Sequence, residues 1–103
     1  MTTPKKAVWQ SIIEKHSPKL WKEIDNIENM VMVEGALSVK TKVLMMMLCD
    51  CLLAHPDGVA GIAGRARSLG ASEAEIAETL AVALFSGGVP AVVTGASAFK
   101  DEE

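Results

Sequence analysis

The sequence predicts an all-α protein of about six helices. Apolar residues recur at helical spacing along most of the 103 residues, and serine or proline stands where several of these periodic segments begin. No run alternates polar and β-branched residues as a strand does, and tyrosine is absent. A chain of this length can build one small core, so we expect a single domain over residues 1–103.

The first two expected helices are amphipathic. Residues 5–15 carry apolar side chains at helical spacing with charged ones around them, which predicts an N-terminal helical arm within residues 1–16. Ser17 and Pro18 supply a cap and a first-turn proline for a second helix that runs to about Met32.

A third and a fourth helix follow on either side of His55. Ser38 can cap the third helix, which is expected to run through about Ala54. Its middle, residues 43–49, is apolar on every side, which is typical of a buried helix. His55 is expected to cap a fourth helix over residues 56–68, because the proline that opens it fits only a first turn. The expected buried stripe of this helix is Val59, Ile62, Ala66 and Leu69.

The C-terminal part holds the clearest helix start. Ser72 and Glu75 have the spacing of a capping box, which predicts a fifth helix that ends at the glycine pair 87–88. A last helix is expected over residues 90–100, followed by an acidic tail at 101–103. The inward residues of the fifth helix are expected to be Ile76, Leu80, Ala83 and Leu84.

The composition excludes some partners and favours others. Half of the residues are hydrophobic and 22% are charged, and the mean hydropathy of +0.27 is high for a small monomer, so we expect a homo-oligomer. A net charge of −3 with only two arginines argues against nucleic acid binding. No apolar run approaches the ~20 residues that span a bilayer and no signal peptide is recognisable, so we expect no membrane association and a cytoplasmic location.

The cysteines invite a redox interpretation that helix geometry opposes. Cys49 and Cys51 are two residues apart, and such side chains point roughly 200° away from each other on a helix. We therefore expect two buried, unpaired thiols. Cys51 and His55 are four residues apart, a spacing at which a histidine could activate the thiol. The alternative is a histidine that ends one helix and caps the next.

Asp50 is a single carboxylate in an otherwise apolar segment, so we expect it to be paired. A structural ion pair is favoured over a catalytic acid. The expected partners are Lys42, Arg65 or Arg67. The ligands for a metal ion are incomplete, since only Asp50 and Asp57 lie near the cysteines and His55, so neither a metal nor another cofactor is expected.

The run HPDGVAGI at residues 55–62, continued by RARSLGASEAEIAE at residues 65–78, resembles the carboxymuconolactone decarboxylase and alkylhydroperoxidase D family. The likeness covers about residues 17–100 and includes the segments at 35–44 and 87–91. It implies an alkylhydroperoxidase D-like helical fold that assembles as a homo-oligomer, a trimer or a hexamer, with residues 17–100 as the family core.

In the peroxidase branch of this family, the chemistry is carried by the motif Cys-x-x-Cys-x-x-x-His and by a glutamate on the preceding helix. Counting back from Gly70, the resemblance places His55 at the first cysteine, Gly58 at the second, Ile62 at the histidine and Val43 at the glutamate. All four positions are changed. Because these side chains cannot cycle through a disulfide, the disulfide peroxidase mechanism is expected to be absent.

Two classes of function stay open. The first prediction is a non-redox oligomeric binding or assembly protein. The alternative is a small-molecule enzyme, either with decarboxylase-like acid–base chemistry on a carboxylated or lactone-like substrate or with residual alkylhydroperoxidase-type antioxidant activity. Of these, a decarboxylase-like lyase is favoured over a thiol peroxidase. His55 is the candidate acid or base, with Cys51 and Asp50 as further candidates, and a ligand pocket is expected around His55 where the third and fourth helices meet.

Overall fold

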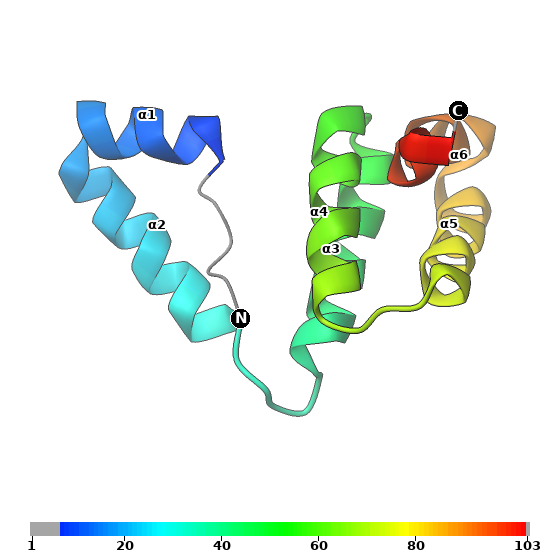
Figure 1. Cartoon of the computed structure of the whole chain (residues 1–103), viewed down its shortest axis with the longest axis horizontal. Helices are drawn as coiled ribbons and strands as arrows, with labels where there is room; N and C mark the ends of the chain where they lie inside the picture. The colour runs from blue at the N-terminus through cyan, green and yellow to red at the C-terminus, as the bar shows by residue number, and fades with distance from the viewer. Residues whose placement is uncertain (1–6, 103) are drawn as a thin grey trace. The chain divides into compact units, whose positions relative to one another are not determined.

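The structure, a computed structural model, describes residues 7–102 and is built of helices joined by short turns, with no strand in that range (Figure 1). The six expected helices and the all-α class are confirmed. None of the helices in the described range is long and apolar enough to cross a membrane. The elements are α1 (Val8–His16), α2 (Pro18–Val31), α3 (Val39–Leu52), α4 (Pro56–Ser68), α5 (Glu73–Gly87), α6 (Val89–Gly95) and a 3₁₀ segment η1 (Ala96–Glu102).

The chain divides into two compact units, Met1–Val33 and Glu34–Glu103. The first unit is the hairpin of α1 and α2, in which the rings of Trp9 and Trp21 meet edge to face with their centroids 6.4 Å apart. Ser17 caps α2 as expected, because its Oγ accepts a hydrogen bond from the Leu20 amide. No side chain of these two helices is buried. The expected start of the arm, at residues 5 and 6, lies outside the described residues.

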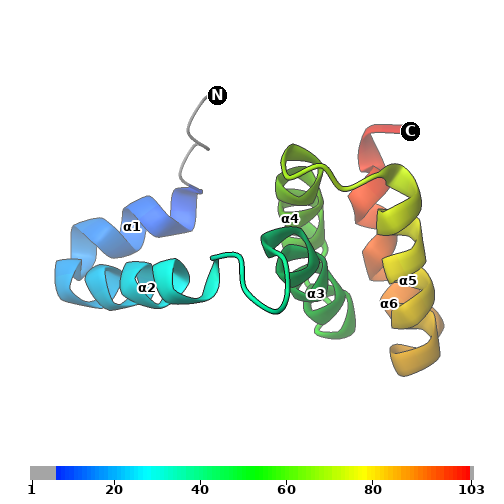
Figure 2. The same ribbon diagram turned by 90° about the horizontal axis from the view of Figure 1, so that it is seen from below.

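The second unit contains α3 to η1, in which α3 packs against α4, α5 and α6 (Figures 1 and 2). Each helix contributes small or medium apolar side chains to one core. Small residues let the helices come close, and a Cβ on Gly95 would clash with the side chain of Leu80. The core side chains are Val43, Met47, Cys51, Val59, Ala63, Ala66, Ala71, Ile76, Ala83, Ala91 and Ala98.

The side chains that are buried on α3, α4 and α5 differ in part from those expected from the sequence. The middle of α3 is covered on one side only, and Met45 on its other side is exposed. On α4, Ala63 is buried whereas Ile62 is half-buried and Leu69 is exposed. Leu84 on α5 is exposed as well. On α4 and α5 the small residues Ala63, Ala66 and Ala83 occupy the closest contacts between helices, and Leu69 and Leu84 remain outside them, whereas Met47 and Ile76 are buried.

The helix starts at Ser38 and Ser72 are confirmed. The Ser38 Oγ accepts a hydrogen bond from the Thr41 amide at 3.0 Å. At α5 the capping box is complete, since the Ser72 Oγ accepts from the Glu75 amide at 3.0 Å and Glu75 Oε1 accepts from the Ser72 amide at 2.8 Å. The Lys40 ammonium binds the same carboxylate at 2.9 Å and ties α3 to α5.

The last helix is shorter than expected. It ends at Gly95 and continues as the 3₁₀ segment η1, with a non-helical backbone at Phe99. Arg67 contacts this segment, because its Nη2 donates a hydrogen bond to the Ala98 carbonyl at 2.9 Å and its guanidinium lies over the Phe99 ring. The Nε and Nη2 of Arg67 also donate hydrogen bonds to the two carboxylate oxygens of Glu73, each at 2.8 Å. Residues 101 and 102 of the expected tail belong to η1.

Candidate functional site at the α3–α4 junction

The turn between α3 and α4 is short and sharply bent. Helix α3 ends at Leu52, and Ala54 adopts a left-handed backbone with φ of 60°. The His55 amide then donates a hydrogen bond back to the Asp50 carbonyl at 2.9 Å, and the His55 carbonyl accepts one from the Val59 amide at 3.0 Å. His55 is therefore the N-terminal flanking residue of α4, as expected, although its side chain makes no capping hydrogen bond.

This turn places the imidazole of His55 beside the carboxylate of Asp50. His55 Nδ1 and Asp50 Oδ1 are 3.1 Å apart, with side-chain exposures of 58% and 20% respectively. Asp50 is thus paired, but the partner is a histidine and not one of the three basic residues expected from the sequence. Periodicity could not find this pair, because the two residues are five apart and the helix ends between them.

The other oxygen of Asp50 faces the first turn of α4. A Cβ built on Gly58 would lie 2.6 Å from Asp50 Oδ2 and 3.0 Å from its Cγ. The carboxylate therefore lies directly against the glycine backbone, where only hydrogen leaves enough room. Its negative charge is also near the N-terminal end of the α4 dipole, which is favourable. Asp50 in this way connects the end of α3 with the start of α4.

The two thiols lie in different surroundings. Cys51 is 1% exposed, and its Sγ would be 3.1 Å from a Cβ on Gly95, so it points into the core. Burial, and secondly the charge of Asp50, raises the pKa of the Cys51 thiol, which is the opposite of nucleophile activation. Because α3 ends at Leu52, Cys51 and His55 do not share a helical face as their spacing suggested. Both cysteines are free, and Cys49 is exposed, contrary to the expectation that it is buried.

The remaining positions indicated by the family pattern have ordinary packing roles. Val43 is completely buried in the core, and Ile62 is half-buried on α4. Among the described residues, no three histidine, cysteine or acidic side chains gather closely enough to hold a metal ion.

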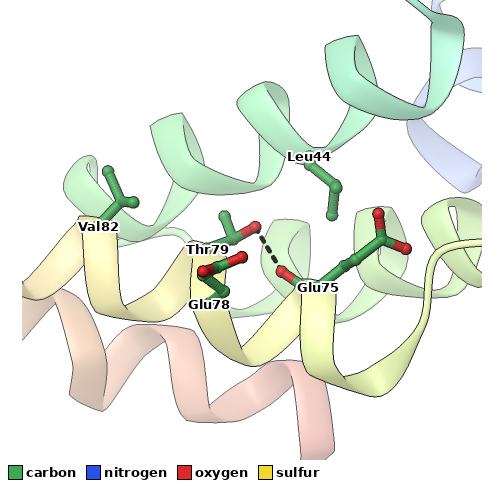
Figure 3. Close-up of a pocket in the computed structure, with 5 residues that line it drawn as sticks. All are labelled: Leu44, Glu75, Glu78, Thr79 and Val82. Atoms are coloured by element: carbon green, nitrogen blue, oxygen red, sulfur yellow. Dashed lines mark hydrogen bonds between the residues drawn. The ribbon is translucent and has the colours of Figure 1, made fainter.

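Two open hollows lie between α3 and α5, and His55 lines neither of them. The first, of about 300 Å³, is drawn in Figure 3, where Leu44 of α3 faces the side chains of α5 and Thr79 donates a hydrogen bond to the Glu75 carbonyl. The second, of about 230 Å³, shares Leu44, Thr79 and Val82 with the first and has an apolar lining. Sequence reasoning missed both, because α3 and α5 are far apart in the chain and meet only in the fold.

In the second unit, the helices pack around α3 and a bent junction joins α3 to α4. This all-helical arrangement is the fold of a known protein family. The pattern of the Carboxymuconolactone decarboxylase family matches residues 18–101, and the chain belongs to this family. Its structure is similar to the crystal structure of an apo carboxymuconolactone decarboxylase family protein from Legionella pneumophila, with a TM-score of 0.83 and 26% sequence identity over 89% of this chain and 82% of that one. No match is found among curated proteins. The resemblance stated from the sequence is thereby confirmed.

Proposed function

We propose that this carboxymuconolactone decarboxylase family protein is a non-redox member, that it acts as an oligomeric binding or assembly protein, and that it does not reduce peroxides through a disulfide. The observation that carries the proposal is the position of the Asp50 carboxylate, 2.6 Å from where a Cβ on Gly58 would be. Counting back from Gly70, the family resemblance implies that position 58 corresponds to the second cysteine of the peroxidase motif. Here the space for a thiol is taken by a carboxylate that His55 holds in place.

The cysteines that the chain does possess offer no replacement for the missing pair. A disulfide needs two sulfur atoms at about 2.05 Å with matching Cβ directions. Cys49 is exposed and Cys51 is buried, on opposite sides of α3. Because the thiolate is the reactive form, the raised pKa of Cys51 also lowers its reactivity at neutral pH.

The redox part is tested by measuring turnover of an alkyl hydroperoxide with a dithiol as reductant. We expect no consumption above the uncatalysed rate for the natural protein, for Cys49→Ser or for Cys51→Ala. Turnover that disappears in either cysteine variant would overturn the non-redox assignment. The oligomeric part is tested separately by light scattering, and a monomer at high micromolar concentration would contradict it.

One observation favours a second candidate function, acid–base catalysis by His55. A carboxylate 3.1 Å from Nδ1 orients the imidazole and favours the tautomer whose Nε2 can accept a proton. The ring is more than half exposed, so a substrate can reach it. The substrate class would be a small carboxylated or lactone-like molecule, with His55 taking up or giving a proton at Nε2.

This candidate is tested by screening such lactones for hydrolysis or loss of carbon dioxide. If His55 is the base, His55→Gln abolishes the reaction, Asp50→Asn reduces it by about 10²-fold or more, and Asp57→Asn leaves it unchanged. Asp57 is a suitable control because it is an exposed carboxylate in the same first turn of α4. A reaction that survives His55→Gln would exclude His55 as the catalytic residue.

A further inference from the structure

The charges of the chain are divided unevenly along its length. Residues 1–22 contain five lysines and one glutamate, a net charge of +4, whereas residues 23–103 contain five basic and twelve acidic residues, a net charge of −7. In the N-terminal hairpin, Lys15, Lys19 and Lys22 are all exposed. The first half of the hairpin is therefore basic, although the protein as a whole is acidic.

The same hairpin exposes an apolar stripe on each of its helices. On α1, Trp9 is 53% exposed and Ile12 is 50% exposed. On α2, Leu20 is 49% exposed and Ile27 is 58% exposed. Residues three or seven apart lie on one side of a helix, so each pair belongs to one stripe.

The two stripes are connected through the tryptophan rings. The edge-to-face contact of Trp9 with Trp21 joins α1 to α2. Ile24 is three residues after Trp21 and four after Leu20, and therefore lies beside both on the surface of α2. The apolar side chains thus follow one another across the hairpin. No side chain of α1 or α2 is buried, and such short helices are marginal in water unless a surface covers their apolar side.

We infer that the hairpin lies on the surface of an anionic lipid bilayer. Amphipathic helices bind there when tryptophan and aliphatic side chains enter the boundary between headgroups and acyl chains, while lysines beside them meet the lipid charge. Trp9, Ile12 and Leu20 supply the apolar part, and Lys15 and Lys19 supply the charge. The expectation of no membrane association rests on the absence of a spanning run and of a signal peptide, and a helix that lies on the surface needs neither.

The combination of charge and apolar side chains favours a bilayer over other partners. A nucleic acid would pair with the lysines but would leave Ile12, Leu20 and Ile27 in water. The acidic residues 23–103 of another copy also complement the charge. Lysine is depleted in interfaces between proteins, however, whereas on a bilayer its long side chain reaches the hydrated headgroups.

The test uses the fluorescence of the full chain, because Trp9 and Trp21 are its only tryptophans and both belong to the hairpin. We expect the emission to shift to shorter wavelength, and the protein to sediment with the vesicles, when equimolar phosphatidylcholine and phosphatidylserine vesicles are added at low salt. Vesicles of phosphatidylcholine alone should have neither effect. High salt should release the protein, because it screens the attraction between lysine and lipid.

The double variant Lys15→Gln, Lys19→Gln should weaken vesicle binding at least about tenfold, since each lysine near an anionic surface raises the affinity about fivefold. Both side chains are exposed and glutamine is compatible with a helix, so the hairpin should stay folded. The matched control is Ala77→Glu, Ala81→Glu, which lowers the net charge equally at exposed positions of α5. It should weaken binding less than about twofold.

Ile27→Gln provides a second variant, which removes an apolar contact and no charge, and at least about tenfold weaker binding is expected. The inference is wrong if anionic vesicles leave the emission unchanged, if both kinds of vesicle bind equally, or if the control weakens binding as much as the lysine variant. A shift that grows with protein concentration in the absence of lipid would assign the face to another copy and would also overturn it. The inference is independent of the proposed function, which turnover and light scattering test.

Discussion

The carboxylate of Asp50 fills the space that a side chain on Gly58 would need. Its Oδ2 lies 2.6 Å from the Cβ position of residue 58, and its Oδ1 lies 3.1 Å from the His55 imidazole. The side chain of Asp50 on α3 therefore leaves no room for a side chain at position 58 in the first turn of α4. This contact distinguishes Gly58 from Gly61 and Gly64, the other two glycines of α4, although the three look equivalent in the sequence.

Gly58→Ala is expected to behave differently from the same substitution at Gly61 or Gly64. A Cβ at either of the latter positions meets nothing within 4 Å, so alanine there should raise the free energy of unfolding by about 0.5–1 kcal/mol through its higher helix propensity. At Gly58 the displaced carboxylate should cancel that gain. Urea titration of the three variants checks this, and a Gly58→Ala protein as stable as Gly61→Ala would show that Asp50 moves aside freely.

The two cysteines should differ strongly in reactivity towards a disulfide reagent at neutral pH. Cys49 is exposed and should react at once. Cys51 is buried and its thiol pKa is raised, so it should react only when the core opens. The measurement is the time course of thiol labelling with and without denaturant, with Cys49→Ser as the control that isolates Cys51. Two equally fast thiols would contradict the burial of Cys51.

Met47 and Met45 allow a matched test of core packing on one helix. Met47 is completely buried, so Met47→Ala should lower the free energy of unfolding by about 2–4 kcal/mol through lost burial and the cavity left behind. Met45 is about half exposed, and Met45→Ala should cost about 1 kcal/mol or less. Thermal and urea unfolding give both values. Equal losses would mean that α3 packs in another rotation.

Acid should destabilise the fold through two carboxylates at the start of α5. The hydrogen bond from Arg67 is the main cause that lowers the pKa of Glu73, and the Ser72 amide followed by Lys40 lowers that of Glu75, both from an ordinary value of 4.5. A group whose pKa is lower in the folded state stabilises it above the unfolded value, and this contribution is lost as the pH falls through the folded value. Stability should therefore decline below about pH 4.5.

The doubly substituted protein Glu73→Gln, Glu75→Gln should show a flatter decline in its urea midpoint as the pH is lowered. Glu78→Gln is the control, since it removes one carboxylate charge from the same helix where the double variant removes two. If the control flattens the decline half as much as the double variant, the effect is the same for each charge removed and comes from net charge, not from the contacts of Arg67 and Lys40.

Local signals predicted the helices well because their causes are local. A serine that caps its own helix, as Ser38 and Ser72 do, needs only the next three residues. Pro56 begins α4 for the same kind of reason, since its ring fits a first turn and its missing N–H is not needed there. The family resemblance could also be recognised in the sequence, because its motifs lie in continuous segments around these helix starts.

The site depended on contacts that no spacing rule describes. Asp50 meets His55 across the end of a helix, and it meets Gly58 from the next one. Arg67 of α4 donates a hydrogen bond to the Ala98 carbonyl of η1, 31 residues further along the chain. The sequence by itself determined the helical class, the helix starts and the family. Only the tertiary structure decided which side of α3 is buried, that Cys51 is buried while Cys49 is exposed, and that Asp50 contacts His55 and Gly58. The physical reason is that these features depend on how the helices pack against one another.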